Sequence, residues 1–201
     1  MTSEEVKNIV GLFYTGHMAV GIFETHYNDG ELKLFYQKYA EKDYQALRKF
    51  KKVMGDGTPP LYVTDGMATI PSDFFAIESA YYRIGIEPIP INFLEDADYD
   101  RLIAHKIEYP TPEYPIGNIQ PDYIRILPKA VKFVVFSYLT KPTPITYAVT
   151  ETRGFIEFDG TGASSTVKWD EANAVLLIQN ILQSLGIITN QTEIKSKIEK
   201  Q

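Results

Sequence analysis

The spacing of apolar residues changes twice along this chain, and this change constrains the fold more than any other feature. Near both ends, apolar side chains recur every three to four residues, which is the period of an amphipathic helix. Between Gly55 and Trp169, Pro and Gly punctuate short runs rich in Val, Ile, Phe and Tyr, which is typical of strands and turns. We therefore predict an α+β fold, with a helical bundle formed by the N- and C-terminal helices and an inserted antiparallel β-rich middle.

We expect a single domain, in which residues 1–55 and 170–201 form the helical part and residues 56–169 the inserted part. The 201 residues suffice for a sizeable core without crosslinks. The chain has no cysteine, which excludes disulfides, thiolate metal sites and cysteine nucleophiles. The first ten residues lack the basic and apolar regions of a secretory signal, so we expect none.

Capping signals place two helices near the N-terminus. Thr2 and Glu5 form a capping-box pair ahead of an apolar stripe that ends near Gly16. A longer helix is expected to start at Asp29 and to end at Gly55.

Four basic residues fall in the last turns of that longer helix, namely Arg48, Lys49, Lys51 and Lys52. They complement the negative end of the helix dipole as a solvated face. The alternative is contact with a DNA backbone or with a protein partner.

Two further helices are expected near the C-terminus. Asp170 is an N-cap, Trp169 can pack over Ala174, and Gly186 ends the stripe. Asn190 then starts a short final helix.

The middle of the chain contains five expected strands, at residues 61–63, Phe74–Ile84, Tyr123–Leu127, residues 131–140 and Phe155–Phe158. In the fourth, Phe133 and Val135 share one face, while Phe136 and Tyr138 lie on the other. A strand that is apolar on both faces is either central in a sheet or faces a partner subunit.

Residues 109–122 contain four prolines, which block both helix and ladder formation, so we expect an extended arm. The arm either wraps around its own domain or reaches across a neighbouring subunit.

No catalytic or metal-binding motif is evident. The histidines, at positions 17, 26 and 105, are far apart and fit no metal-ligand spacing. The segment 162–165 lacks the second glycine of a nucleophile elbow, and residues 159–162 lack the Gly-Lys-Ser/Thr of a phosphate loop. We expect no enzyme activity, no metal and no cofactor.

The densest acidic run, which contains Glu95, Asp96, Asp98 and Asp100, precedes Leu102 and Ile103. It lacks the glycine of a calcium loop. We interpret it as the N-terminal turn of a local helix, where carboxylates favour the helix dipole.

Several short motifs occur in an order that resembles a known family. They are Ile70-Pro71-Ser72-Asp73-Phe74, Glu87-Pro88-Ile89-Pro90, Arg101 ahead of Tyr109-Pro110 through Pro115, Ile124-Arg125-Ile126-Leu127-Pro128, Tyr138-Leu139 with Pro142 and Pro144, Ser164 through Trp169, and Leu185-Gly186-Ile187. Over residues 29–188 the chain resembles the structural ring proteins of crAss-like and related Bacteroidetes bacteriophages, in the head-to-tail connector or adaptor group.

The resemblance implies a non-enzymatic virion protein that forms a ring, typically dodecameric, beneath the portal or within the tail barrel. Such a ring bridges portal and tail, lines the DNA passage during ejection and is assembled in the host cytoplasm. The implied partners are copies of the chain, the portal protein and neighbouring tail ring proteins, with at most non-specific DNA contact and no membrane. We predict subunit contacts by aromatic, valine and proline residues, namely Phe133, Val135, Phe136, Tyr138, Tyr109, Pro110, Pro112, Tyr114 and Pro115.

Two other classes of function stay open. A β-rich carbohydrate-binding module would use Tyr81, Tyr82, Tyr114 and Trp169 as stacking platforms. A hydrolase would need two carboxylates that converge in a pocket.

Overall fold

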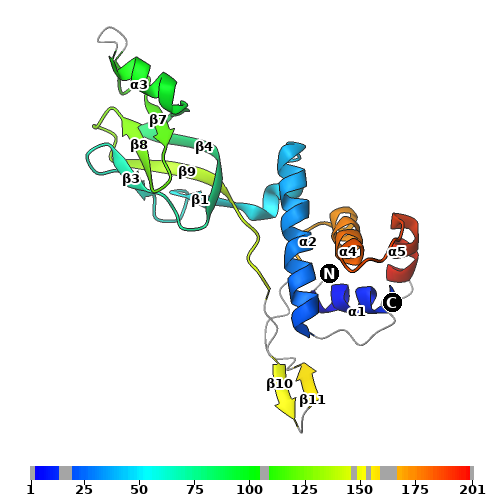
Figure 1. Cartoon of the computed structure of the whole chain (residues 1–201). Helices are drawn as coiled ribbons and strands as arrows, with labels where there is room; N and C mark the ends of the chain where they lie inside the picture. The colour runs from blue at the N-terminus through cyan, green and yellow to red at the C-terminus, as the bar shows by residue number, and fades with distance from the viewer. Residues whose placement is uncertain are drawn as a thin grey trace. The chain divides into compact units, whose positions relative to one another are not determined.

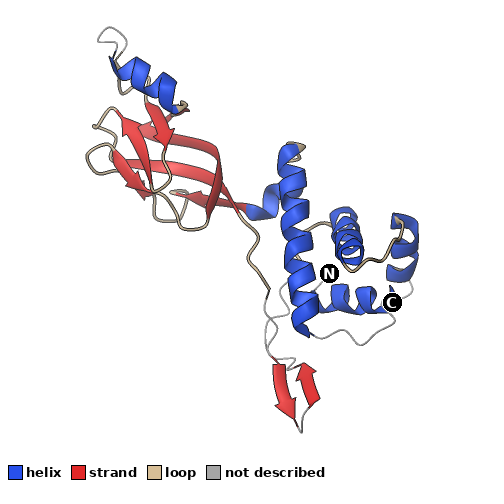
Figure 2. Ribbon diagram, viewed as in Figure 1, coloured by secondary structure: helices blue, strands red, loops and turns tan. Residues whose placement is uncertain are grey.

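The structure, a computed structural model, describes residues 3–13, 20–104, 109–145, 149–152, 155–158 and 167–199. The chain forms two compact units. We call Met1–Phe50 with Lys141–Gln201 the helical unit, and Lys51–Thr140 the inserted unit. Helices dominate the first and strands the second (Figure 2). The predicted α+β fold, with an antiparallel β-rich middle between helices that pack together, is confirmed.

The compact inserted unit begins slightly before the insertion of residues 56–169 that we expected, at Lys51, and ends well before it, at Thr140. Its first strand, β1 (Lys51–Met54), pairs with its last strand, β9 (Phe133–Thr140). The pairing of these two strands therefore sets the limits of the unit.

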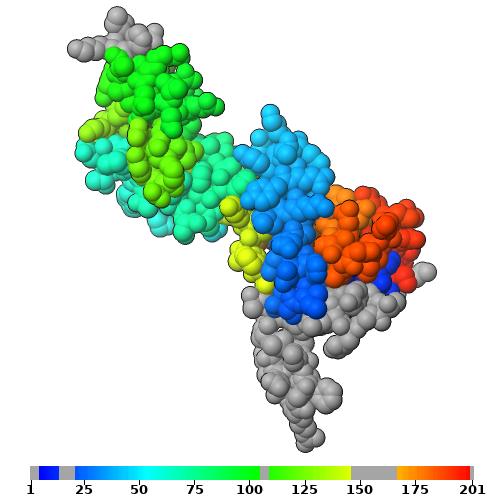
Figure 3. Space-filling view, in the orientation of Figure 1, coloured from blue at the N-terminus to red at the C-terminus, as the bar shows by residue number. Residues whose placement is uncertain are grey.

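The helical unit contains the helices α1 (Ser3–Phe13), α2 (Val20–Ala40), α4 (Glu171–Ser184) and α5 (Gln191–Ile198), and the short 3₁₀ helix η1 (Ala46–Phe50). Helix α4 packs against α1, α2 and α5. Figure 3 shows α2 directly against α4. The core between the helices is apolar and includes Val6, Ile9, Phe23, Leu34, Phe35, Leu177, Ile178 and Ile181.

Both C-terminal helices begin at the predicted caps. The Asp170 side chain accepts a hydrogen bond from the Asn173 N–H at 2.8 Å. Asn190 and Glu193 form a complete capping box at the start of α5. Gly186 has a φ of 78° and follows α4, which is the left-handed position where glycine commonly ends a helix.

The second helix differs from the prediction at both ends, because α2 begins at Val20 and ends well before Gly55. Lys42 has a φ of 57°, and its N–H donates to the Tyr39 carbonyl oxygen at 3.1 Å. The N–H of the next residue donates to the Lys38 carbonyl oxygen at 3.0 Å. These two bonds form a Schellman motif, which ends a helix and is usually built on glycine. A lysine occupies the position here, so the sequence carries no visible stop signal.

The inserted unit contains two sheets (Figure 1). The first sheet has the order β1, β9, β4 (Phe74–Ile84) and β5 (Glu87–Pro90), and β2 (Leu61–Tyr62) also pairs with β9. The second sheet has the order β3 (Met67–Thr69), β8 (Tyr123–Leu127), β7 (Ile116–Ile119) and β6 (Asn92–Phe93). All of these pairs are antiparallel except β6 with β7.

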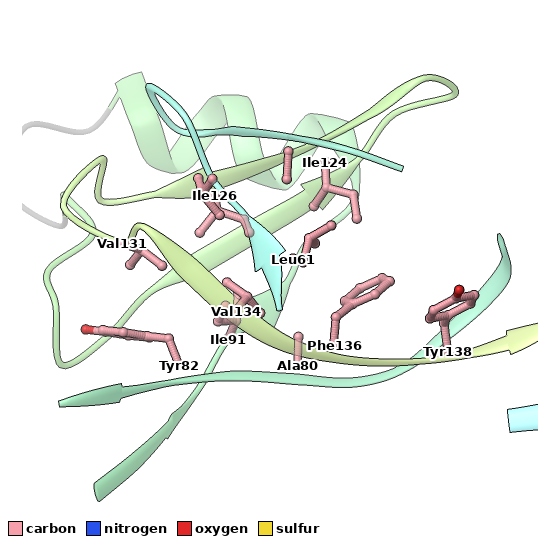
Figure 4. Packing of buried hydrophobic residues seen from close by; sticks show 12 residues of the cluster. Leu61, Ala80, Tyr82, Ile91, Ile124, Ile126, Val131, Val134, Phe136 and Tyr138 are labelled. Carbon is pink, nitrogen blue, oxygen red and sulfur yellow. The ribbon is translucent and has the colours of Figure 1, made fainter. Parts of the chain in front are cut away.

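A hydrophobic core lies between the two sheets. Figure 4 shows Val134 and Phe136 of β9 pointing toward Ile124 and Ile126 of β8. Together with Leu61 and other apolar side chains they form one cluster of buried residues. A second, smaller cluster joins Tyr99 of α3 (Asp96–Ala104) to the second sheet. The inserted unit therefore has a core of its own.

Strand β9 is central in the first sheet, with β1 and β2 on one side and β4 on the other. Both of its faces are buried from Val134 to Thr140. This explains why the strand is apolar on both faces and selects the first of the two alternatives that the sequence left open. The predicted bounds Phe74–Ile84 and Tyr123–Leu127 are also confirmed.

The proline-rich segment packs on its own unit. Its residues Ile116–Ile119 form β7, and both Pro110 and Pro115 are buried. The Tyr82 hydroxyl donates to the Pro112 carbonyl oxygen. The segment is thus anchored within the chain rather than extended away from it.

Strands β10 (Val149–Thr152) and β11 (Phe155–Phe158) form an antiparallel pair, so the strand expected at Phe155–Phe158 is confirmed. The glycine-rich turn at 159–162 and the serines at 164 and 165 lie outside the described residues.

Candidate functional site

The outer face of the first sheet carries a group of aromatic and basic side chains, most of which are exposed. Successive side chains on a strand point to opposite faces of the sheet. Leu61, Val134, Ala80 and Tyr82 belong to the core between the sheets. Their neighbours along the strands therefore point away from the core, and we call four of these, Tyr62, Tyr81, Arg83 and Phe133, the aromatic–arginine patch.

The geometry of the aromatic–arginine patch is well defined. Tyr62 and Phe133 lie directly opposite each other on β2 and β9, and they are 68% and 48% exposed. On β4, the Arg83 guanidinium carbon lies 5.8 Å from the Tyr81 ring centroid. The Asp56 carboxylate lies 3.6 Å from the guanidinium and accepts a hydrogen bond from the Tyr81 hydroxyl at 3.4 Å. Tyrosine, phenylalanine and arginine are the residues that are enriched at protein interfaces.

Three of the predicted contact residues are buried inside the subunit. Val135, Phe136 and Tyr138 are all buried. Phe136 and Tyr138 stack with ring centroids 5.5 Å apart, and the Tyr138 hydroxyl donates to the Asp73 carboxylate at 2.9 Å. Because these three side chains are covered by their own chain, they stabilise the subunit and are not available for contact with a neighbour. Phe133 is the predicted β9 residue that remains exposed.

The proline-rich segment presents one exposed turn. Residues 111–114 reverse direction, with the Tyr114 N–H donating to the Thr111 carbonyl oxygen at 3.1 Å. Pro112 and Glu113 lie at the tip and are exposed, and Tyr114 is 79% exposed. We call residues 111–114 the proline turn. Of the predicted arm residues, Tyr109, Pro112 and Tyr114 are therefore accessible, whereas Pro110 and Pro115 are buried anchors.

The four basic residues do not share the end of one long helix. Arg48 and Lys49 lie in the last turn of the short helix η1, whereas Lys51 and Lys52 begin β1. The Lys51 ammonium lies 2.6 Å from the Glu78 carboxylate, and Lys52 pairs with Asp73. Because both lysines are held in ion pairs within the inserted unit, their charge is largely compensated, which disfavours contact with phosphate.

The aromatic residues of the carbohydrate-binding alternative do not form one platform. Trp169 is 4% exposed and packs in the helical unit, with its ring centroid 4.9 Å from that of Phe50. Tyr82 is buried among core residues. Two of the four rings are therefore inaccessible to a sugar, which needs an open aromatic face.

A buried carboxyl group lies in the helical unit. Glu31 on α2 is only 5% exposed. Burial raises its pKa from 4.5 to about 7, while the positive charge of Lys168 and the nearby Trp169 indole N–H lower that pKa by less. The indole N–H has no hydrogen-bond partner of ordinary geometry among the described residues, which agrees with burial being the dominant effect. Nothing in the sequence pattern singled out Glu31, since burial depends on the packing of helices distant in sequence.

The acidic run and the histidines have structural roles where they are described. The Asp96 carboxylate accepts hydrogen bonds from the amides of Asn118 and Gln120, at 2.8 and 2.5 Å. Asp98 pairs with Arg101 at 2.8 Å. His26 shares a hydrogen bond of 2.9 Å with Ser184.

The other two histidines, at 17 and 105, lie outside the described residues. In the part of the chain that the structure describes, no three His, Cys, Asp or Glu side chains are grouped so as to hold a metal ion. None of the helices in this part is both long and apolar enough to span a membrane.

Comparison with known proteins adds no relative, because neither a protein-family model nor a curated protein sequence matches the chain.

Proposed function

We propose that this chain is a non-enzymatic structural protein of a bacteriophage virion and that it forms a ring that connects the head to the tail. The aromatic–arginine patch is the observation that carries this proposal. Tyrosine, phenylalanine and arginine side chains are exposed together on a sheet face, which is the composition of an adhesive protein surface. The ordered motifs between residues 29 and 188, which resemble the connector ring proteins, support the particular kind of assembly.

A subunit of a closed ring needs two different contact surfaces, because each copy meets its two neighbours in opposite senses. The inserted unit offers two such surfaces, the aromatic–arginine patch and the proline turn. Both stand on a sandwich with its own core, so they are held rigidly.

The proposal is tested by the assembly state of the purified protein and by its presence in particles. Mass photometry and negative-stain electron microscopy, with the protein alone and with the portal protein of the same phage, should show closed rings. Mass spectrometry of purified virions should find the chain. A protein that stays monomeric under both conditions and is missing from particles would contradict the proposal.

A ring that passes DNA should not hold it tightly. The net charge of −6 and the ion-paired lysines of β1 favour weak contact with a polyanion. We therefore expect weak DNA binding that falls steeply with salt concentration, as measured by fluorescence anisotropy. Tight, sequence-selective binding at physiological salt would be inconsistent with a passive channel wall.

A further inference from the structure

We infer that the aromatic–arginine patch of one copy binds the proline turn of the next copy, so that the two surfaces form a single head-to-tail subunit contact. This inference rests on the proposed function and names the contact through which the ring would form.

The two surfaces lie on opposite sides of strand β4. Because side chains alternate along a strand, Tyr81 and Arg83 point to the outer face of the first sheet. Tyr82, which is labelled in Figure 4, belongs to the core cluster on the inner face. The Tyr82 hydroxyl holds the proline turn by donating to the Pro112 carbonyl oxygen. The patch and the turn therefore face away from each other within one copy. A contact between the patch and the turn therefore joins different copies. It leaves one patch and one turn free at the two ends of the pair, so that further copies can bind in the same way until a ring closes.

The apolar parts of the two surfaces match. Tyr62 and Phe133 form an exposed aromatic pair, and the tip of the turn presents Pro112 next to the exposed ring of Tyr114. Proline rings and extended proline-containing segments bind well to grooves lined by aromatic side chains. Two flat aromatic surfaces with a proline between them also need little rearrangement to pack.

The charges of the two surfaces are complementary. Arg83 has a side chain that is 49% exposed and a single loose ion pair, in which 3.6 Å separates it from Asp56. Glu113 at the tip of the turn is exposed, and no ion pair to another described residue involves it. When a second copy places Glu113 beside Arg83, the guanidinium gains a second carboxylate partner. Arginine has enough N–H donors to bind two carboxylates.

The proline turn is held in place before any partner arrives. Its backbone is closed by the Tyr114 N–H, and the Asn92 N–H donates to the Pro115 carbonyl oxygen at 3.1 Å immediately after the turn. The buried Pro110 anchors the other side. A preformed turn loses little conformational entropy on binding, so even a small contact yields useful affinity. Each copy in a closed ring makes two such contacts, so we expect ring closure to strengthen the assembly.

The absence of cysteine from the whole chain makes disulfide trapping a clean test. Two single-cysteine proteins, Tyr62→Cys and Tyr114→Cys, are mixed at ring-forming concentration and oxidised. The expected product is the mixed dimer, in at least about tenfold excess over either like dimer. Asp122→Cys, on an exposed turn of the inserted unit, replaces Tyr114→Cys as the matched control and should not trap.

Charge reversal gives an independent readout. Arg83→Glu and Glu113→Arg should each lower the yield of rings at least about fivefold, and the double variant that carries both changes should restore it. Arg101→Glu, which reverses an exposed arginine elsewhere on the inserted unit, should leave the yield unchanged. Circular dichroism of each variant verifies that the fold is intact.

The possible results separate the inference from the proposed function. If rings form, but no mixed dimer is trapped and neither charge reversal changes the yield of rings, the inferred contact is wrong. The proposed ring-forming function would still stand. Trapping of Tyr62→Cys with itself would mean that the patch binds its own equivalent, and trapping to a portal or tail protein in particles would mean a different occupant; each overturns the inference alone. A chain that makes no rings and is missing from virions overturns both.

Discussion

Replacing Glu31 by glutamine should remove a pH dependence from the stability of the helical unit. In the folded chain burial raises the pKa of this carboxyl to about 7, from 4.5. The folded state therefore keeps a proton that the unfolded state loses once the pH exceeds about 4.5. Between pH 4.5 and 7 unfolding releases this proton, so the free energy of unfolding falls as the pH rises and is lowest above pH 7.

The size of the effect follows from the two pKa values. A pKa shift of one unit corresponds to about 1.4 kcal/mol. At pH 8 the buried carboxyl therefore lowers the free energy of unfolding by up to about 3 kcal/mol. Glu31→Gln keeps the size and polarity of the side chain but does not titrate. We expect the variant and the natural chain to be about equally stable near pH 4.5, and the variant to be about 2–3 kcal/mol more stable at pH 8.

The assay is guanidinium unfolding at both pH values, followed by the fluorescence of Trp169. Trp169 is the only tryptophan of the chain and is buried beside Glu31 in the helical unit, so it reports on the relevant unit alone. Glu199→Gln, at an exposed position in the same unit, is the control and should change stability equally at both pH values. If Glu31→Gln changes the free energy of unfolding equally at the two pH values, then Glu31 is ionised in the folded chain. The charge of Lys168 would then lower the pKa of Glu31 more than burial raises it.

Substitutions at four further positions test the packing and the helix ends. Gly117→Ala should destabilise the inserted unit by about 1–3 kcal/mol in thermal unfolding, because a Cβ there would lie 2.7 Å from the Phe93 ring. Gly21→Ala on α2 should instead stabilise by up to about 1 kcal/mol, because no described atom outside the backbone of its own helix turn lies within 4 Å of its Cβ position; equal effects at both glycines would refute the steric argument. Lys42→Gly should raise the melting temperature, with a gain of about 1 kcal/mol, and a loss would mean that the lysine side chain outweighs its backbone strain. Asp170→Ala should cost about 1 kcal/mol, seen as a lower denaturation midpoint, and Asp170→Asn should retain most of that stability.

The elements that could be predicted are those whose signals are local. The bounds Phe74–Ile84 and Tyr123–Leu127 follow from short apolar runs between turn residues. The starts of α4 and α5 follow from Asp170 and Asn190, because an N-cap acts within one turn. For such elements the neighbouring residues contain all of the necessary information.

The elements that were missed depend on partners distant in sequence. Strand β1 begins with two lysines and forms because Lys51 pairs with Leu139 of β9. Strand β7 lies within a proline-rich segment and is held between β6 and β8. The early end of α2 is the exception, because its cause is local: Lys42 adopts a conformation that glycine usually adopts.

The candidate site was predicted in part. Phe133 and Tyr114 were named from the sequence and are exposed. Tyr62 was missed, although it follows the buried Leu61 in a run expected to be a strand, and alternation alone would have placed it on the outer face. That it lies opposite Phe133 depends on strand register, which a single sequence does not specify.

Lys51 and Leu139, which lie where the inserted unit begins and ends, face each other across one antiparallel ladder. The two ends of the inserted unit therefore lie about 5 Å apart, a gap that an ordinary hairpin turn would span. A short loop could therefore take the place of the whole inserted unit in the chain. A gene encoding this chain could lengthen, trim or replace the sandwich without disturbing the helices.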